Sequence, residues 1–205
     1  MKSGKIKLLG SKRDTEADIS RRKGLAIDAY KTLEKIFENK KIGVVLRIRV
    51  FNTYISSVFL YNSELWTLTK SLEELIDAFH RKQLRKVLNI YWPDKISNEE
   101  LYRRTQVKKW SWVVKKKRLM WLGHLLRLDK ETPARQALVE YTKPVKKKVG
   151  RPRLTWVNQV FTDLKYSNID DVKFGNEYDM ILGLEEICKD RPRWTHIVKS
   201  IMLIY

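Results

Sequence analysis

The chain of 205 residues has little of what metal sites and disulfide scaffolds are made of. A single cysteine, Cys188, excludes an intramolecular disulfide framework and any cysteine-rich zinc module. None of the three histidines shares a short spacing with another metal-ligating residue, so the sequence predicts no metal and no cofactor. Glycine (8) and proline (5) are few, which excludes collagen-like and loop-dominated architectures.

Sequence motifs of common enzyme classes are also absent. There is no glycine-rich phosphate loop, and no nucleophile elbow surrounds any serine. The adjacent carboxylates Asp170 and Asp171 have no partner carboxylate motif upstream, so we interpret them as part of a polar turn. The sequence therefore predicts no catalytic residue, and we expect that the chain is not an enzyme.

No long uninterrupted apolar run occurs. The most apolar window, 44–66, contains Arg47, Arg49, Asn52 and Glu64, which makes it too polar for a membrane span and typical of a buried helix. The first ten residues are basic and do not resemble a signal peptide. Hydrophobic residues still make up 43%, with seven tryptophans, which is enough for a core. We expect an intracellular protein without a membrane partner.

Positive charge is abundant and unevenly distributed. Lysine and arginine number 43 against 24 acidic residues, a formal net charge of +19. The segment 101–162 holds seventeen of these bases and three acids, and its runs 101–128 and 141–162 contain no acid at all. Four tryptophans lie within it: Trp110, Trp112, Trp121 and Trp156. Cations beside flat aromatic rings are typical of surfaces that bind phosphates and unstacked bases, although a solvated basic surface is the alternative interpretation.

The predicted partner is nucleic acid (RNA, DNA or an RNA–DNA duplex), bound largely without sequence preference. Trp110 and Trp112 are predicted to stack on bases, whereas Trp121 fits a core position better. The string 149–153 is interpreted as a basic hinge, with a minor-groove hook as the alternative. The predicted phosphate contacts are Lys108, Lys109, Lys115, Lys116, Lys117, Arg118, Lys146, Lys147, Lys148, Arg151 and Arg153.

Hydrophobic periodicity predicts a mainly α fold with at most a short strand at 6–10. Capping boxes at Thr15, Ser71 and Ser97 mark three helix starts. The predicted helices cover residues 15–39, 44–66, 71–90, 97–104, 107–128 and 153–165, followed by one or two helices over 184–205 that break at Pro192. The predicted domains are 12–142, a helical bundle, and 154–205, a C-terminal helical segment, joined by a basic linker at 143–153.

Several strings, taken together and in order, resemble a known family. They are Leu9–Ser11, Glu16–Arg22, Leu60–Lys70, Phe79–Leu88, Trp92–Tyr102, Trp121–His124, Gly150–Trp156 and Cys188–Trp194. In this order they resemble the C-terminal thumb and post-thumb region of the endonuclease/reverse transcriptase of non-LTR (LINE-type) retrotransposons. The resemblance covers nearly the whole chain.

This resemblance implies a start just after the polymerase palm. Residues 1–11 would be the remnant of the post-palm hairpin, and the helices of 12–142 would form the thumb, which grips the template–primer duplex. The palm with its aspartate pair, the endonuclease domain and the downstream Cys/His knuckle are missing from the sequence, so no catalytic residue carries over. Tyr61-Asn62-Ser63 also departs from the family string before Glu64. We therefore expect a truncated or domesticated remnant.

Four functional hypotheses follow. The chain is a non-catalytic nucleic-acid-binding fragment, or it completes a palm-containing polymerase supplied by another chain. Alternatively it is a decayed retroelement reading frame without independent function, or a domesticated protein-interaction module. The lysine strings 115–118 and 146–148 are also typical of nuclear import signals, so nuclear residence is indicated.

Overall fold

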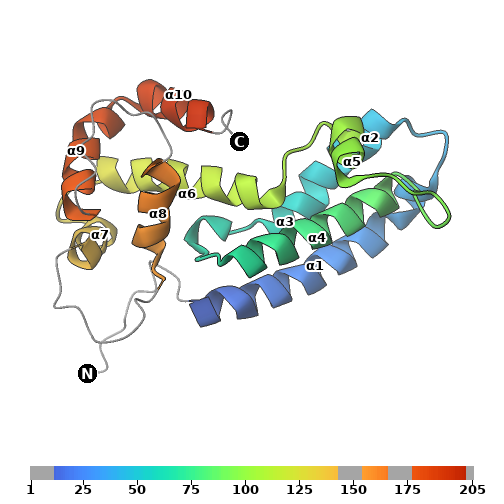
Figure 1. Cartoon of the computed structure of the whole chain (residues 1–205), viewed down its shortest axis with the longest axis horizontal. Coiled ribbons are helices and arrows are strands. Elements are labelled where there is room, and N and C mark those ends of the chain that lie inside the picture. The colour runs from blue at the N-terminus through green and yellow to red at the C-terminus, as the bar shows by residue number, and fades with distance from the viewer. Residues whose placement is uncertain (1–11, 143–153, 166–176, 202–205) are drawn as a thin grey trace. The chain divides into compact units, whose positions relative to one another are not determined.

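The computed structural model describes residues 12–142, 154–165 and 177–201, which form helices joined by turns and loops (Figure 1). The described residues contain no strand, which confirms the mainly α prediction. The strand expected at 6–10 and the linker expected at 143–153 lie outside them. None of the described helices is long and apolar enough to cross a membrane.

The described chain divides into two compact units. Unit 2 holds residues 13–62 and 68–113, and unit 1 holds residues 63–67 and the described residues from 114 onward. The predicted domain boundaries at 142/143 and 153/154 border the undescribed linker, and they stay predictions.

Unit 2 is built from three long helical stretches and a short helix. The second stretch ends earlier than the predicted Trp66, because Asn62 adopts a left-handed conformation with φ of 57°. The elements are α1 (Lys12–Glu38), α2 (Val44–Val50) with its continuation as the π-helical η1 (Phe51–Ser56) and α3 (Ser57–Phe59), α4 (Lys70–Val87) and α5 (Asn98–Thr105).

Helices α1 and α4 run in the same direction, as Figure 1 shows. The Nζ of Lys23 in α1 lies 5.6 Å from the ring centroid of Phe79 in α4. About two turns further along both helices, the Nζ of Lys86 in α4 lies 5.1 Å from the ring centroid of Tyr30 in α1. The α2–α3 stretch lies with them and runs the opposite way.

A buried arginine ties the ends of these three stretches together. The Nη1 of Arg47, at the start of α2, donates to the carbonyl oxygens of Phe37 at 3.2 Å and Val87 at 3.0 Å. Phe37 and Val87 lie at the C-terminal ends of α1 and α4, where carbonyls lack helical partners and carry partial negative charge. One guanidinium therefore neutralises the ends of two parallel helices.

The core of unit 2 is a stack of aromatic rings. The Trp110 ring lies nearly parallel to those of Phe59 and His80, at 4.3 and 4.4 Å between centroids. The Phe51 ring lies parallel beside both His80 and Trp110, at 5.9 and 6.0 Å. Such pairs contribute about 0.5–1.5 kcal/mol each beyond area burial.

The helix starts of unit 2 test the predicted capping boxes. Ser97 caps α5, its Oγ accepting the Glu100 N–H at 3.1 Å, which confirms that box. The prediction for α4 was wrong by two residues, because Thr69 takes the extended cap conformation and its Oγ1 accepts the Leu72 N–H at 3.3 Å. The prediction at Thr15 was also wrong, since α1 begins at Lys12 and runs through it.

Unit 1 packs five helices around an aliphatic core. Helix α7 was not predicted, and α9 begins at Glu177 instead of 184. The elements are η2 (Ser63–Leu65), α6 (Trp110–Arg127, whose first four residues belong to unit 2), α7 (Pro133–Thr142), α8 (Trp156–Lys165), α9 (Glu177–Lys189) and α10 (Arg191–Ile201). The buried core includes Leu119, Leu122, Leu125, Val160, Leu164, Met180, Ile181, Leu184 and Val198.

A tryptophan of α10 packs directly on the backbone of α6. Asp190 caps α10, its Oδ1 accepting the Arg193 N–H at 3.0 Å, and so fixes the helix start. The buried Trp194 then donates its Nε1 to the Leu119 carbonyl oxygen at 3.1 Å. Its indole covers Gly123 so closely that a Cβ added there would lie 2.2 Å from Nε1.

Two helical glycines, Gly24 of α1 and Gly123 of α6, should therefore respond oppositely to alanine. Gly123→Ala is expected to destabilise the protein by about 1–3 kcal/mol or more, because Trp194 would have to leave its hydrogen bond. Gly24→Ala in α1 meets no atom within 4 Å and is expected to stabilise by about 0.5–1 kcal/mol. Urea unfolding measures both; equal effects of the two variants would contradict the packing described.

The buried His80 should make unit 2 sensitive to acid. Burial lowers the pKa of His80 to about 3, with a smaller contribution from the charge of Arg81. At pH values between about 3 and 6.5, His80 is protonated in the unfolded chain and neutral in the folded chain. The free energy of unfolding should therefore fall by about 1.4 kcal/mol for each unit that the pH drops within this range.

The variant His80→Phe isolates this effect. Both imidazole nitrogens are buried and make no hydrogen bond to the described part of the chain, so phenylalanine keeps the ring stack and removes the titration. Urea unfolding at pH 7, 6, 5 and 4 should show a shallower loss of stability for the variant. Parallel curves for variant and wild type would count against a neutral buried His80.

Candidate nucleic-acid interface

The first two predicted contact lysines, Lys108 and Lys109, are exposed in unit 2 just before α6. The start of α6 is fixed by a buried carboxylate of α4: Asp77 accepts the backbone N–H of Ser111 at 2.9 Å and its hydroxyl at 2.7 Å. Because this carboxylate already caps the helix, the neighbouring lysine charges are left for groups in solvent.

Trp112 lies beside one of these lysines. The Nζ of Lys108 is 5.6 Å from the Trp112 ring centroid, and the ring is half-buried. A half-exposed indole thus lies next to exposed lysines, which is the pairing of aromatic ring and positive charge that the sequence analysis associates with nucleic-acid binding.

Trp110 does not belong to the interface. Its ring is 2% exposed and is the central member of the aromatic stack of unit 2, so the prediction that it stacks on bases is corrected. Trp110 lies three and four residues before Val113 and Val114 on α6, so it shares their apolar side of the helix, and burial there takes precedence over its basic neighbours.

The next three predicted contacts, Lys115, Lys116 and Lys117, lie on α6 in unit 1. Lys116 is exposed, whereas Lys115 and Lys117 are half-buried. The Nζ of Lys117 lies 3.5 Å from the Glu64 carboxylate, so this lysine already has an acidic neighbour. Lys116 is therefore the member of this group that is most open to a phosphate.

Arg118 is a structural residue rather than a phosphate contact. Its side chain is fully buried, its Nη1 donates to the Asp163 carboxylate of α8 at 2.6 Å, and its Nη2 donates to the Trp66 carbonyl oxygen at 3.3 Å. Burial raises the pKa of Asp163, while the charges of Arg118 and Lys115 oppose that rise. The predicted role of Arg118 is corrected, because a buried, paired guanidinium does not reach a ligand in solvent.

Two of the sequence strings that resemble the retrotransposon family, Leu60–Lys70 and Gly150–Trp156, contact each other next to Arg118. Trp156 of α8 is buried and donates its Nε1 to the Glu64 carbonyl oxygen at 2.7 Å, two residues before the carbonyl that Arg118 binds. The segment 63–67 is therefore held by backbone contacts from two helices. The sequence indicates this structural role by the position of Arg118 and Trp156 among apolar residues of their helices. N–H groups buried in such positions need acceptors inside the protein.

The remaining predicted contacts lie outside the described residues. They are Lys146, Lys147, Lys148, Arg151 and Arg153.

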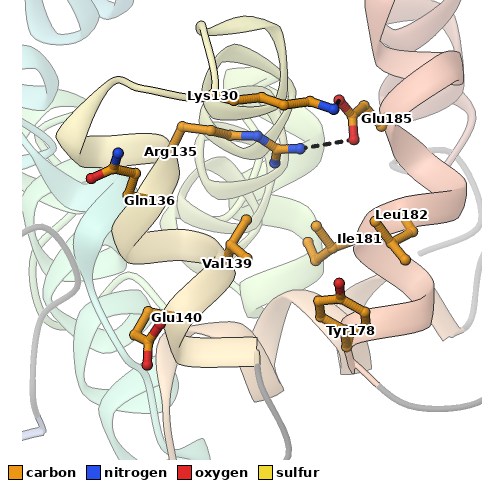
Figure 2. A pocket seen from close by; sticks show the side chains of 9 residues that line it. All are labelled: Lys130, Arg135, Gln136, Val139, Glu140, Tyr178, Ile181, Leu182 and Glu185. Atoms are coloured by element: carbon orange, nitrogen blue, oxygen red, sulfur yellow. Dashed lines mark ion pairs between the residues drawn. The ribbon is translucent and has the colours of Figure 1, made fainter.

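A pocket of about 480 Å³ lies between α7 and α9 in unit 1 (Figure 2). Across its upper edge, Arg135 of α7 donates to Glu185 of α9 at 3.1 Å, and Lys130 approaches the same carboxylate at 3.8 Å. Tyr178 and Ile181 of α9 face Val139 of α7 below. Two basic and two acidic side chains line the pocket, the second acid being Glu140, so it has no preference for an anion.

Among the described residues, no group of three histidine, cysteine, aspartate or glutamate side chains is arranged to hold a metal ion. Cys188 is buried, and this burial raises the pKa of its thiol to about 12, so its thiolate is not available as a nucleophile near neutral pH.

Comparison with known proteins gives one informative match. The chain is 24% identical over 192 residues to an uncharacterised transposon-derived protein of Caenorhabditis elegans, a match that covers 89% of this chain and 64% of that protein. The chain thus spans less than two thirds of its relative's length. No family model matches the sequence, and no solved structure matches it. The similarity supports a transposon origin for the chain.

The ion pair of Arg118 should be essential for unit 1. Asp163→Ala is expected to destabilise the protein by about 3–5 kcal/mol, because it leaves a fully buried guanidinium without its counter-charge. The double variant Arg118→Met/Asp163→Leu removes both charges and should recover most of the loss. Thermal and urea unfolding would measure both; a single variant within about 1 kcal/mol of wild type would contradict a structural pair.

Proposed function

We propose that this chain is a non-catalytic, transposon-derived protein that binds nucleic acid largely without regard to sequence. The observation that carries the proposal is the acid-free run 101–128, in which the exposed lysines Lys108 and Lys109 lie just before α6 and the exposed Lys116 lies on it. Of the four arginines in this run, Arg103 and Arg104 share the Glu100 carboxylate, each at 2.6 Å, Arg118 is buried, and Arg127 donates to the Cys188 carbonyl oxygen. The exposed lysines are therefore the main charges open to phosphates.

The physical basis is counterion release. Each lysine that replaces a condensed counterion on the phosphate backbone adds affinity that declines as salt rises. The half-buried Trp112 beside Lys108 offers a further contact to an unpaired base. Neither contact reads a base edge, which is why the proposed binding is largely independent of sequence.

A finer assignment rests on the resemblance to the thumb and post-thumb region of LINE-type reverse transcriptases. A helical bundle with a basic segment suits the gripping of a template–primer duplex, and the transposon-derived relative is consistent with that source. On this proposal the chain acts beside a palm-containing polymerase chain, within the nucleus.

The second candidate is a retroelement remnant without independent function. The relative favours it, since that protein is described only as transposon-derived and uncharacterised. Each unit also contains a buried arginine whose hydrogen bonds are made within that unit, Arg47 in unit 2 and Arg118 in unit 1. Such internal consistency favours a chain that folds and can act as a protein. A domesticated protein-interaction module is a third candidate, distinguished by partners that remain bound after nuclease treatment.

A salt titration tests the proposal. Anisotropy of a labelled duplex of random sequence should give an affinity that falls linearly on a log–log plot against salt. Lys108→Gln/Lys109→Gln should reduce the magnitude of the slope by about 2, since two phosphate contacts are lost, and Lys116→Gln by about 1.

Two controls accompany these variants. Lys31→Gln/Lys35→Gln removes the same charge from exposed positions of α1 in the same unit and should leave the slope unchanged. Arg118→Met/Asp163→Leu should also leave it unchanged, because Arg118 is buried. A folded wild-type protein that does not bind at low salt, or that binds with a flat salt response, would support the remnant without function.

A further inference from the structure

The loop between α4 and α5 displays two aromatic side chains in solvent. Trp92 is 87% exposed and Tyr91 is 55% exposed, which makes Trp92 the most exposed large apolar residue of the described chain. A buried tryptophan contributes several times the free energy of an exposed one, and the other tryptophans of the described ranges are buried or half-buried. Trp92 therefore contributes little to folding, and its ring faces are free for a ligand.

The backbone that carries these rings is tied down at both ends. Asn89 adopts a left-handed conformation with φ of 56° and donates its Nδ2 to the Phe37 carbonyl oxygen of α1 at 3.1 Å. The Ile90 N–H donates to the Arg85 carbonyl oxygen at 2.9 Å, and the Asp94 N–H to that of Tyr91 at 2.8 Å. These bonds present the two rings from a fixed turn.

The far end of the loop is tied to the same helix. Arg85 of α4 donates its Nη2 to the Asn98 side-chain oxygen at 2.9 Å and to the Ile96 carbonyl oxygen at 3.4 Å. Both ends of the loop thus return to Arg85, through its main chain on one side and its guanidinium on the other. A preorganised loop binds with less loss of conformational entropy.

Cations outnumber acids around the two rings. The bond from Asn89 to Phe37 brings the loop next to the end of α1, where the exposed Lys40 and Lys41 follow (Figure 1). The segments that meet at this end of unit 2, 34–41 and 85–100, carry six basic side chains (Lys35, Lys40, Lys41, Arg85, Lys86 and Lys95) and five acidic ones (Glu34, Glu38, Asp94, Glu99 and Glu100), and Glu100 pairs with two arginines of its own helix. Exposed lysines beside exposed aromatic rings match a phosphate backbone whose bases are unpaired.

We infer that Tyr91 and Trp92 form a stacking platform for unpaired bases, so that this end of unit 2 binds single-stranded nucleic acid. The inference rests on the proposed function and adds a second mode to it. Lysines contact the phosphates of either form, whereas an indole face stacks only on a base that is not covered by its neighbours in a duplex. The platform therefore favours single strands over duplexes.

One observation points to a different occupant. Val45 is 77% exposed and Leu46 is 50% exposed in the first turn of α2, which begins at the same end of unit 2. This aliphatic surface would suit a second copy of the chain. The planar rings and the positive charge favour nucleic acid, and the oligomeric state is measured alongside to distinguish the two.

The test compares Trp92→Ala, Trp92→Phe and the control Tyr141→Ala, which removes a 62% exposed aromatic ring from α7 in unit 1. The probes are a labelled oligothymidine strand and a labelled duplex of the same length. Trp92→Ala should weaken binding of the single strand about tenfold, as expected for the loss of one stacked base, and leave duplex binding unchanged. Trp92→Phe should retain most of the single-strand affinity, and Tyr141→Ala all of it.

The other outcomes are distinct. Salt-dependent binding that Trp92→Ala leaves intact for both probes, or weakens equally for both, overturns the platform and keeps the proposed function. If the protein binds neither the single strand nor the duplex, the stacking platform and the proposed function are both overturned. If the wild type self-associates in size-exclusion chromatography while Trp92→Ala is monomeric with unchanged single-strand affinity, the patch binds a second copy and the inference fails.

Discussion

Buried side-chain N–H groups need acceptors inside a protein, and in the described part of this chain several of them donate to main-chain carbonyls. In unit 2, Arg47 binds the last carbonyls of α1 and α4. In unit 1, Arg118 and Trp156 bind the carbonyls of Trp66 and Glu64, and Trp194 binds that of Leu119. Each of these contacts joins segments far apart in sequence, so the choice of acceptor sets how the helices pack.

The basic residues of the described chain include buried arginines that hold the structure together and exposed lysines that remain in solvent. Arg47, Arg118 and Arg135 are buried and paired, although the last two belong to the basic segment 101–162. The lysines at 108, 109 and 116 remain in solvent. A count of bases therefore overstates the charge that is available to a polyanion. Arginine takes the structural positions because its planar fork satisfies several acceptors at once, whereas the compact ammonium of lysine favours water.

Periodicity and capping chemistry were sufficient to predict the mainly helical fold and the start of α5 at Ser97, because both are local. The predictions failed where tertiary contacts decide. Trp110 looked like part of a basic surface and is the centre of a ring stack, since Phe59 and His80 reach it from other helices. Thr69 replaced Ser71 as the cap, although Ser71 and not Thr69 has a glutamate three residues later. The exposure of Trp92 had no sequence signal, because Tyr91-Trp92-Pro93 reads only as a helix break.

The π-helical stretch Phe51–Ser56 in the middle of an otherwise α-helical segment has a different kind of consequence. A wide turn of this type accommodates one more residue than an α-helical turn, and it is the form in which a helix absorbs a single-residue insertion without unfolding. Loss of one residue from the α-helical turns on either side would rotate everything after it by about 100° around the helix axis and move Phe59 away from Trp110. Loss of one residue from the wide turn itself would leave an ordinary α-helix with Phe59 still facing Trp110, so this turn is the place within the helical segment where the aromatic stack tolerates a change in length.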